Sequence, residues 1–97
     1  MIRSDYAYEV TTYKGRNFIF IEDLNMGNRS VTNDIENVVA DIAKRESINP
    51  RQYYIIYRDS EGNWDGWDDA NQDFIGIGET QKYDAADALI NRQSLPA

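Results

Sequence analysis

The sequence contains neither cysteine nor histidine among its 97 residues. Without cysteine the chain cannot form disulfides, thiolate metal sites or a thiol nucleophile. The lack of histidine removes the commonest general base and the commonest ligand for transition metals. These absences exclude several kinds of catalytic centre, and we expect no enzymatic activity, no catalytic residues, no cofactor and no metal.

Long apolar runs are absent too. No run approaches the roughly 20 residues that a bilayer span needs, and residues 1–10 lack the apolar stretch of a secretory signal. We therefore expect a cytoplasmic protein without membrane contact. At 41% hydrophobic residues the chain is globular in composition, and its length predicts a single domain over residues 1–97.

Basic residues are missing from one window of the chain. Residues 59–79 contain seven acids and no lysine or arginine, whereas the segments on either side contain acids and bases in equal number. The whole net charge of −7 therefore lies in this window. The acids of the window are Asp59, Glu61, Asp65, Asp68, Asp69, Asp73 and Glu79.

Such a concentration of like charge repels itself and destabilises a compact state. Soluble proteins usually intersperse the signs of their surface charges. The window therefore indicates a strongly basic partner or a bound cation. Direct binding of nucleic acid is not expected, because nucleic-acid-binding proteins carry basic surfaces.

The hydrophobic pattern predicts an α+β domain in which helices and a sheet form two layers. The expected order is ββαββ(β)α, with an antiparallel sheet of four to five strands and two helices. Strands are predicted over 6–13, 18–21, 52–58 and 63–67, with a short strand or irregular connection over 74–77. The run 18–21 is apolar at every position, which is typical of a central strand.

The first helix is predicted to begin near Thr32 or Asn33, where Asn33 and Glu36 have the spacing of a capping box. Its apolar stripe consists of Ile35, Val38, Val39, Ile42 and Ala43. The second helix is predicted over 83–91, with Ala86, Leu89 and Ile90 facing inward. The acidic window then forms the second hairpin and the connection into this helix.

One interpretation of the acidic window is a divalent-cation site. Glu61, Asn63, Asp65 and Gly66 match positions 1, 3, 5 and 6 of an EF-hand loop. Position 1 prefers Asp, however, and Gln72 stands where the loop needs a bidentate Glu. A different oxygen-rich Ca²⁺ or Mg²⁺ site remains an alternative.

A second interpretation is a carbohydrate site, either a glycosidase with paired carboxylates or a binding module. Trp64 and Trp67, beside Asp65 and Asp68, would form its stacking platform. A chain of this size without histidine is a poor host for a sugar cleft, and the two tryptophans fit a hydrophobic core better.

The third interpretation is mimicry of nucleic acid. One DNA strand carries a phosphate about every 3.4 Å, and a β-strand rises about 3.3 Å per residue. Carboxylates along a strand and its turns can therefore present negative charge at a similar spacing. Trp64, Trp67 and Phe74 interleave with the acids and would be core side chains or anchors for a partner.

The chain resembles the small, acidic, phage-encoded inhibitors that imitate DNA, and among them the anti-CRISPR proteins that block type I-F surveillance complexes. The resemblance extends from the start MIRSDYAYEV through YYIIYRDSEGNWDGWDDANQDF. It implies a monomer in the host cytoplasm that occupies the basic DNA-binding site of the complex (Cascade/Csy) and evades host defence without catalysis. Inhibitors of uracil-DNA glycosylase, which are similarly small and acidic, and antagonists of restriction systems are alternatives.

The sequence therefore favours a partner-binding site made of the seven acids, with Trp64 and Trp67 as anchors. A divalent-cation or carbohydrate-binding module and a structural phage protein remain the alternatives of a different class. On the mimicry hypothesis, exchange of Asp65, Asp68 and Asp69 for Asn is expected to abolish inhibition and to leave the fold intact.

Overall fold

A computed structural model describes residues 6–23, 34–59 and 61–92 of the chain. Five strands form one sheet in the order β1-β2-β3-β4-β5. The elements along the chain are β1 (Tyr6–Tyr13), β2 (Arg16–Asp23), α1 (Ile35–Glu46), the short 3-10 helix η2 (Pro50–Gln52), β3 (Tyr54–Arg58), β4 (Trp64–Asp68), β5 (Asp73–Phe74) and α2 (Lys82–Arg92). The predicted α+β class and the predicted order of elements are confirmed. Neither helix in the described ranges is long and apolar enough to cross a membrane.

The sheet is mixed, not wholly antiparallel as predicted. β2 and β3 run parallel, whereas the other three neighbouring pairs are antiparallel. The reason is the connection between them: parallel neighbours need a crossover, and α1 with η2 supplies it. β3 is thereby the central strand between β2 and β4, and β1 and β5 lie at the two edges of the sheet.

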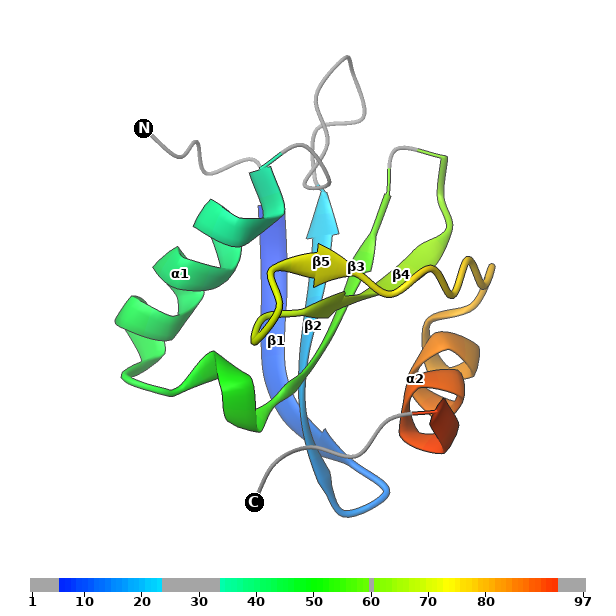
Figure 1. Ribbon diagram of the computed structural model, residues 1–97, viewed down its shortest axis with the longest axis horizontal. Helices are drawn as coiled ribbons and strands as arrows, with labels where there is room; N and C mark the ends of the chain where they lie inside the picture. Colours follow the sequence, from blue (N-terminus) through cyan, green and yellow to red (C-terminus); the bar gives the residue numbers. More distant parts are fainter. Residues whose placement is uncertain (1–5, 24–33, 60, 93–97) are drawn as a thin grey trace.

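The two helices lie on opposite faces of the sheet, so the domain has three layers instead of the predicted two (Figure 1). β2 explains this arrangement, because its alternate side chains point to opposite faces. Ile19 and Ile21 pack with the apolar stripe of α1, whereas Phe18 and Phe20 pack with α2. A strand that is apolar at every position requires a cover on both sides.

The predicted stripe of α1 is buried at Ile35, Val38, Val39 and Ile42. The helix begins at Ile35 after Asp34, and its acidic first turn contains Glu36. The predicted start at Thr32 or Asn33 lies outside the described residues. In α2 the predicted inward residues Ala86 and Leu89 are buried, together with Ala85.

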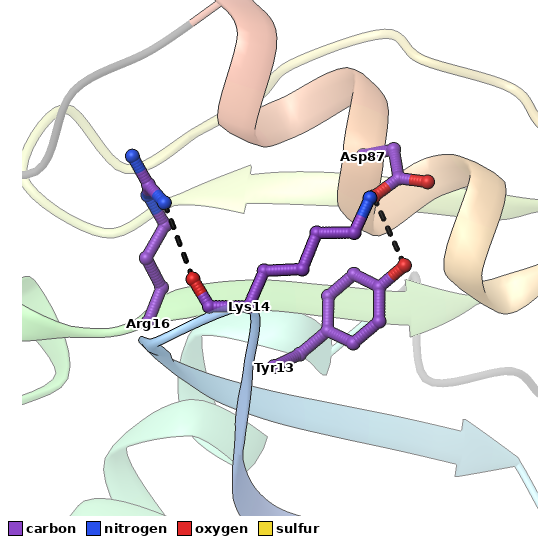
Figure 2. A network of polar contacts seen from close by, with 4 residues as sticks. All are labelled: Tyr13, Lys14, Arg16 and Asp87. Carbon is purple, nitrogen blue, oxygen red and sulfur yellow. Dashed lines mark hydrogen bonds and ion pairs between the residues drawn. The ribbon is translucent and has the colours of Figure 1, made fainter.

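The turn between β1 and β2 contains two residues, Lys14 and Gly15, with φ of +52° and +75°. Two positive φ values define the tight turn that matches the twist of a hairpin, and glycine adopts them at no steric cost. The tip of this hairpin is fixed to α2 through Asp87 (Figure 2). Asp87 Oδ1 accepts a hydrogen bond from the Tyr13 hydroxyl at 3.0 Å and lies 2.8 Å from Lys14 Nζ.

Candidate partner-binding surface

The acidic window forms one edge of the sheet, and we call its described residues, 59 and 61–79, the acidic edge. They comprise β4, β5, the β3–β4 turn, the β4–β5 turn and the segment that leads to α2. The two turns lie at opposite ends of β4 (Figure 1). The seven acids therefore extend along an edge instead of gathering at one point.

The two tryptophans belong to the core. Trp64 is 8% exposed and packs on the α2 side, whereas Trp67 is 6% exposed and packs on the α1 side. Because they are three positions apart on a strand, their side chains point to opposite faces. They cannot form one stacking platform, and the prediction that both anchor a partner is replaced by the core interpretation.

Asp59 organises the β3–β4 turn. Its Oδ1 accepts hydrogen bonds from the backbone nitrogens of Glu61 and Asn63, both at 2.9 Å. Its backbone N–H donates to the carbonyl of Asn63, and its carbonyl accepts from Gly62. Asp59 thus closes the turn through its side chain, a common use of aspartate in loops.

The segment that follows β5, residues 75–79, runs beside β4 and contains a bulge. We call it the outer segment. Trp67 lies opposite Phe74, and Trp64 forms an isolated bridge with Glu79. Three residue steps on β4 thus face five steps on the outer segment, so this segment contains two extra residues. A bulge leaves backbone N–H groups without partners in the ladder.

The carboxylate of Asp65 satisfies these N–H groups. Its Oδ1 accepts from the backbone nitrogens of Gly76 at 2.9 Å and Ile77 at 2.7 Å, and from its neighbour Gly66 at 2.7 Å. On the other face of β4, a Cβ on Gly66 would lie 3.0 Å from Ile75 Cδ1. Asp65 and Gly66 therefore hold the outer segment against β4 from two sides.

The β4–β5 turn uses the next two acids. Asp68 Oδ1 accepts from the backbone nitrogens of Ala70 and Asn71, and its Oδ2 accepts from Asn71 Nδ2 at 2.7 Å. Asp69 Oδ1 accepts from Gln72 Nε2 at 3.0 Å and from the indole N–H of Trp67 at 3.3 Å. Asp68 and Asp69 thus take part in the turn as acceptors, a role that an Asn amide oxygen can also fill. An unchanged fold after their exchange for Asn stays a prediction.

The remaining three acids are less engaged. Asp73 is exposed, and its Oδ1 accepts only from the backbone nitrogen of Phe74. The side chains of Glu61 and Glu79 form no hydrogen bond or ion pair within the described ranges. Glu61 and Asp73 are exposed and Glu79 is partly buried, so these three carboxylates have the fewest contacts within the described chain.

None of the seven carboxylates forms an ion pair with another described residue. The ion pairs of the described chain are Lys14–Asp87, Arg45–Asp41 and Arg58–Glu22, and all lie outside this set of acids. The five aspartates of the edge accept hydrogen bonds only from neutral N–H groups. Their negative charge consequently remains uncompensated.

This charge affects Tyr57, which lies opposite Asp65 across the β3–β4 pair. Burial raises the pKa of the Tyr57 hydroxyl well above its ordinary value, and the charges of Asp65 and Asp59 raise it further. Like charge disfavours ionisation of the phenol. Burial and the two nearby acids therefore both favour the neutral form of Tyr57.

The cation interpretation gains no support from the arrangement of the edge. Asp65, which the EF-hand alignment assigns as a ligand, directs Oδ1 at backbone N–H groups. Among residues 6–23, 34–59 and 61–92, no group of three acidic side chains is placed to hold a metal ion.

Phe74 is the aromatic residue of the acidic edge that is open to solvent. Its side chain is 46% exposed, and its ring lies 5.1 Å from that of Trp67 and 6.0 Å from that of Tyr57. Phe74 interleaves with the acids in the sequence, as the two predicted anchors Trp64 and Trp67 do. Phe74 lies at the end of a two-residue strand at the sheet edge, where no further strand among the described residues covers it.

Comparison of the chain with protein-family models, curated proteins and solved structures finds no match.

Proposed function

We propose that the protein is a non-enzymatic inhibitor that occupies a basic DNA-binding groove and presents the acidic edge in place of DNA. The main observation in support of this proposal is that seven acids lie along one sheet edge without an ion pair among the described residues. A protein that needed these acids only for solubility would gain stability by pairing some of them with nearby bases.

The way in which the acids are held supports this proposal. Asp59 and Asp65 each direct Oδ1 at backbone N–H groups, and within the described ranges their Oδ2 atoms accept no hydrogen bond. These carboxylates are thereby fixed in place, and each keeps one oxygen that has no donor among the described residues. Fixed groups lose less conformational freedom on binding, which favours affinity.

The dimensions of the edge also fit the proposal. β4 contains five residues, and a strand of that length spans roughly 16 Å. That length corresponds to about five phosphate steps along one DNA strand. Because acids lie in the strand and in the turns at both of its ends, the edge offers negative charge over the whole distance.

Phe74 supplies an apolar contact amid this charge. Binding energy in protein interfaces concentrates in a few side chains, of which buried aromatic anchors are typical. Phe74 already packs on Trp67 and Tyr57, so its ring is positioned before any partner binds. We assign it the anchoring role in place of the two tryptophans.

The partner that we propose is the type I-F CRISPR surveillance complex in the host cytoplasm, on the strength of the sequence resemblance. Its DNA-binding site would meet the acidic edge with lysine and arginine side chains. Charge complementarity of this kind accelerates association and makes it sensitive to salt.

A pull-down tests this proposal. The tagged protein is added to lysate of a host that expresses the complex, with and without target DNA. We expect the complex to be retained on the protein and to be released by excess DNA. Retention that DNA does not reduce would contradict competition for the DNA site, and failure to retain the complex would contradict the choice of partner.

A further inference from the structure

A shallow pocket of about 150 Å³ lies on the α2 side of the sheet, at the N-terminal end of α2. Its lining residues include the aromatic Phe20 and Trp64 and the charged Glu9, Glu22 and Lys82. Pockets with aromatic walls and a few charged groups bind cations that have an apolar stem.

Lys82 places its own ammonium group among three aromatic rings. Its Nζ lies 5.0 Å from the ring centre of Phe20, 5.1 Å from that of Tyr83 and 6.0 Å from that of Trp64. Within the described ranges Lys82 forms no ion pair. Aromatic faces, and not a carboxylate, therefore hold the positive charge in this position.

The two carboxylates of the pocket differ in their state. Glu22 Oε1 lies 2.8 Å from Nη1 of Arg58 and is already paired. Glu9 is exposed and has no ion pair in the described part of the chain. A cation that entered the pocket would therefore meet aromatic residues and the unpaired Glu9 among its lining residues.

The pocket adjoins the acidic edge. Trp64 is one of the lining residues, and its backbone N–H and carbonyl both form hydrogen bonds with the backbone of Glu79. A basic surface that covered the edge would therefore bring lysine or arginine side chains to the pocket. Lys82 has a long, flexible stem, so its head group can move into solvent when another cation enters.

We propose that this pocket receives the cationic head group of a lysine or arginine side chain of the basic partner, and that Lys82 is the internal cation which this group displaces. The identity of the partner rests on the proposed function. The cation preference of the pocket does not, and it is measurable on the isolated protein.

The test is an NMR titration of the protein with N-acetylargininamide, N-acetyllysinamide and the neutral N-acetylcitrullinamide. The two tryptophans provide an internal control, because Trp64 lines the pocket and Trp67 packs on the other face. We expect one or both cationic probes to shift the Trp64 indole N–H signal in a saturable way, with little change at Trp67. The stronger of the two identifies the preferred side chain. Equal shifts with the citrulline derivative, or no saturable shift at Trp64, would overturn the proposal.

Two variants sharpen the test. Lys82→Ala removes the competing cation and should strengthen probe binding by roughly two- to thirtyfold, the range of a cation–π contact. Lys82→Gln, which keeps most of the stem, should change binding in the same direction. Glu9→Gln should weaken binding by about two- to fivefold. Weaker binding to both Lys82 variants would show that Lys82 is part of the fold and not a displaceable occupant.

The outcome is separable from that of the proposed function. If the pull-down succeeds and the probes do not bind, the pocket proposal is contradicted and the proposed function is not. If the probes bind and the complex is not retained, the cation preference of the pocket is supported and the choice of partner is contradicted.

Discussion

Oδ1 of Asp65 lies 2.7 Å from the backbone nitrogen of Ile77, twelve positions further along the chain. This contact joins the middle of β4 to the segment that leads into α2. A residue that the sequence presents as one acid among seven thus determines the path of the sheet edge. The acidic edge is in consequence both a structural unit and a charged surface.

The first prediction concerns this contact. Asp65→Ala leaves the backbone N–H groups of Gly76 and Ile77 without their acceptor. We expect a loss of about 1–3 kcal/mol in the free energy of unfolding, measured by urea denaturation. Asp65→Asn should cost less, because the amide oxygen still accepts. Unchanged stability of Asp65→Ala, with Asp73→Ala as the matched control, would show that the bulge does not need this acceptor.

The second prediction concerns pH and the network in Figure 2. The hydrogen bond from Lys14 lowers the pKa of Asp87, with a further contribution from Tyr13, and Asp87 in turn raises the pKa of Lys14. A carboxyl whose pKa is lowered by folding stabilises the native state above its unfolded pKa of about 4. That contribution is lost as pH falls through the lower folded value.

The raised pKa of Lys14 has the opposite effect on the pH dependence of stability. The stabilisation from Lys14 is complete below its unfolded pKa of about 10.4. It is lost as pH rises through the higher folded value. Stability from this contact is therefore present between these limits. Thermal melting of Asp87→Asn from pH 2 to pH 7 should show a smaller fall in Tm on the acid side than melting of the wild type. An identical acid limb would contradict a stabilising role for the pair.

The third prediction separates the exposed aromatic residue from the buried one. Phe74→Ala should cost only about 1 kcal/mol of stability but weaken retention of the partner about tenfold or more. Trp67→Ala, which removes a core side chain, should cost about 3–5 kcal/mol. Denaturation and partner binding are measured on both variants. Full partner binding by a folded Phe74→Ala protein would remove Phe74 from the interface.

The fourth prediction follows from the unpaired charge. Salt screens repulsion between surface charges, so raising the NaCl concentration should raise the Tm of the wild type. A variant with Glu61→Gln, Asp73→Asn and Glu79→Gln should be at least as stable as the wild type and less sensitive to salt. A Tm of the wild type that is independent of salt, or falls with it, would show that the acids do not repel one another appreciably.

Local patterns predicted most of the elements. The bounds of β1 agree with the prediction from alternation, and the apolar stripe of α1 is buried as its spacing indicates. The prediction of two layers was wrong, although one sequence feature indicated three. The all-apolar run 18–21 requires a cover on both faces, which a two-layer domain does not provide.

The candidate site was predictable only in part. Once Trp64 and Trp67 are assigned to one strand, their spacing alone places their side chains on opposite faces of the sheet. This placement was therefore predictable from the sequence. The role of Asp65 was not, because it depends on a bulge between segments that pair only in the folded chain. For the same reason, the sequence could not show which acids are engaged by backbone N–H groups.

The most direct test of the central claim measures displacement of labelled target DNA from the purified surveillance complex. The variant with Glu61→Gln, Asp73→Asn and Glu79→Gln is compared with a control that has Glu36→Gln, Glu46→Gln and Asp84→Asn. Both raise the net charge by the same amount, and the control acids are exposed on α1 and α2. We predict that the edge variant displaces half of the DNA only at a concentration about tenfold or more above that of the wild type. The control variant should need a concentration within about threefold of the wild-type value. Equal potency of the two variants would contradict the claim that the acidic edge takes the place of DNA.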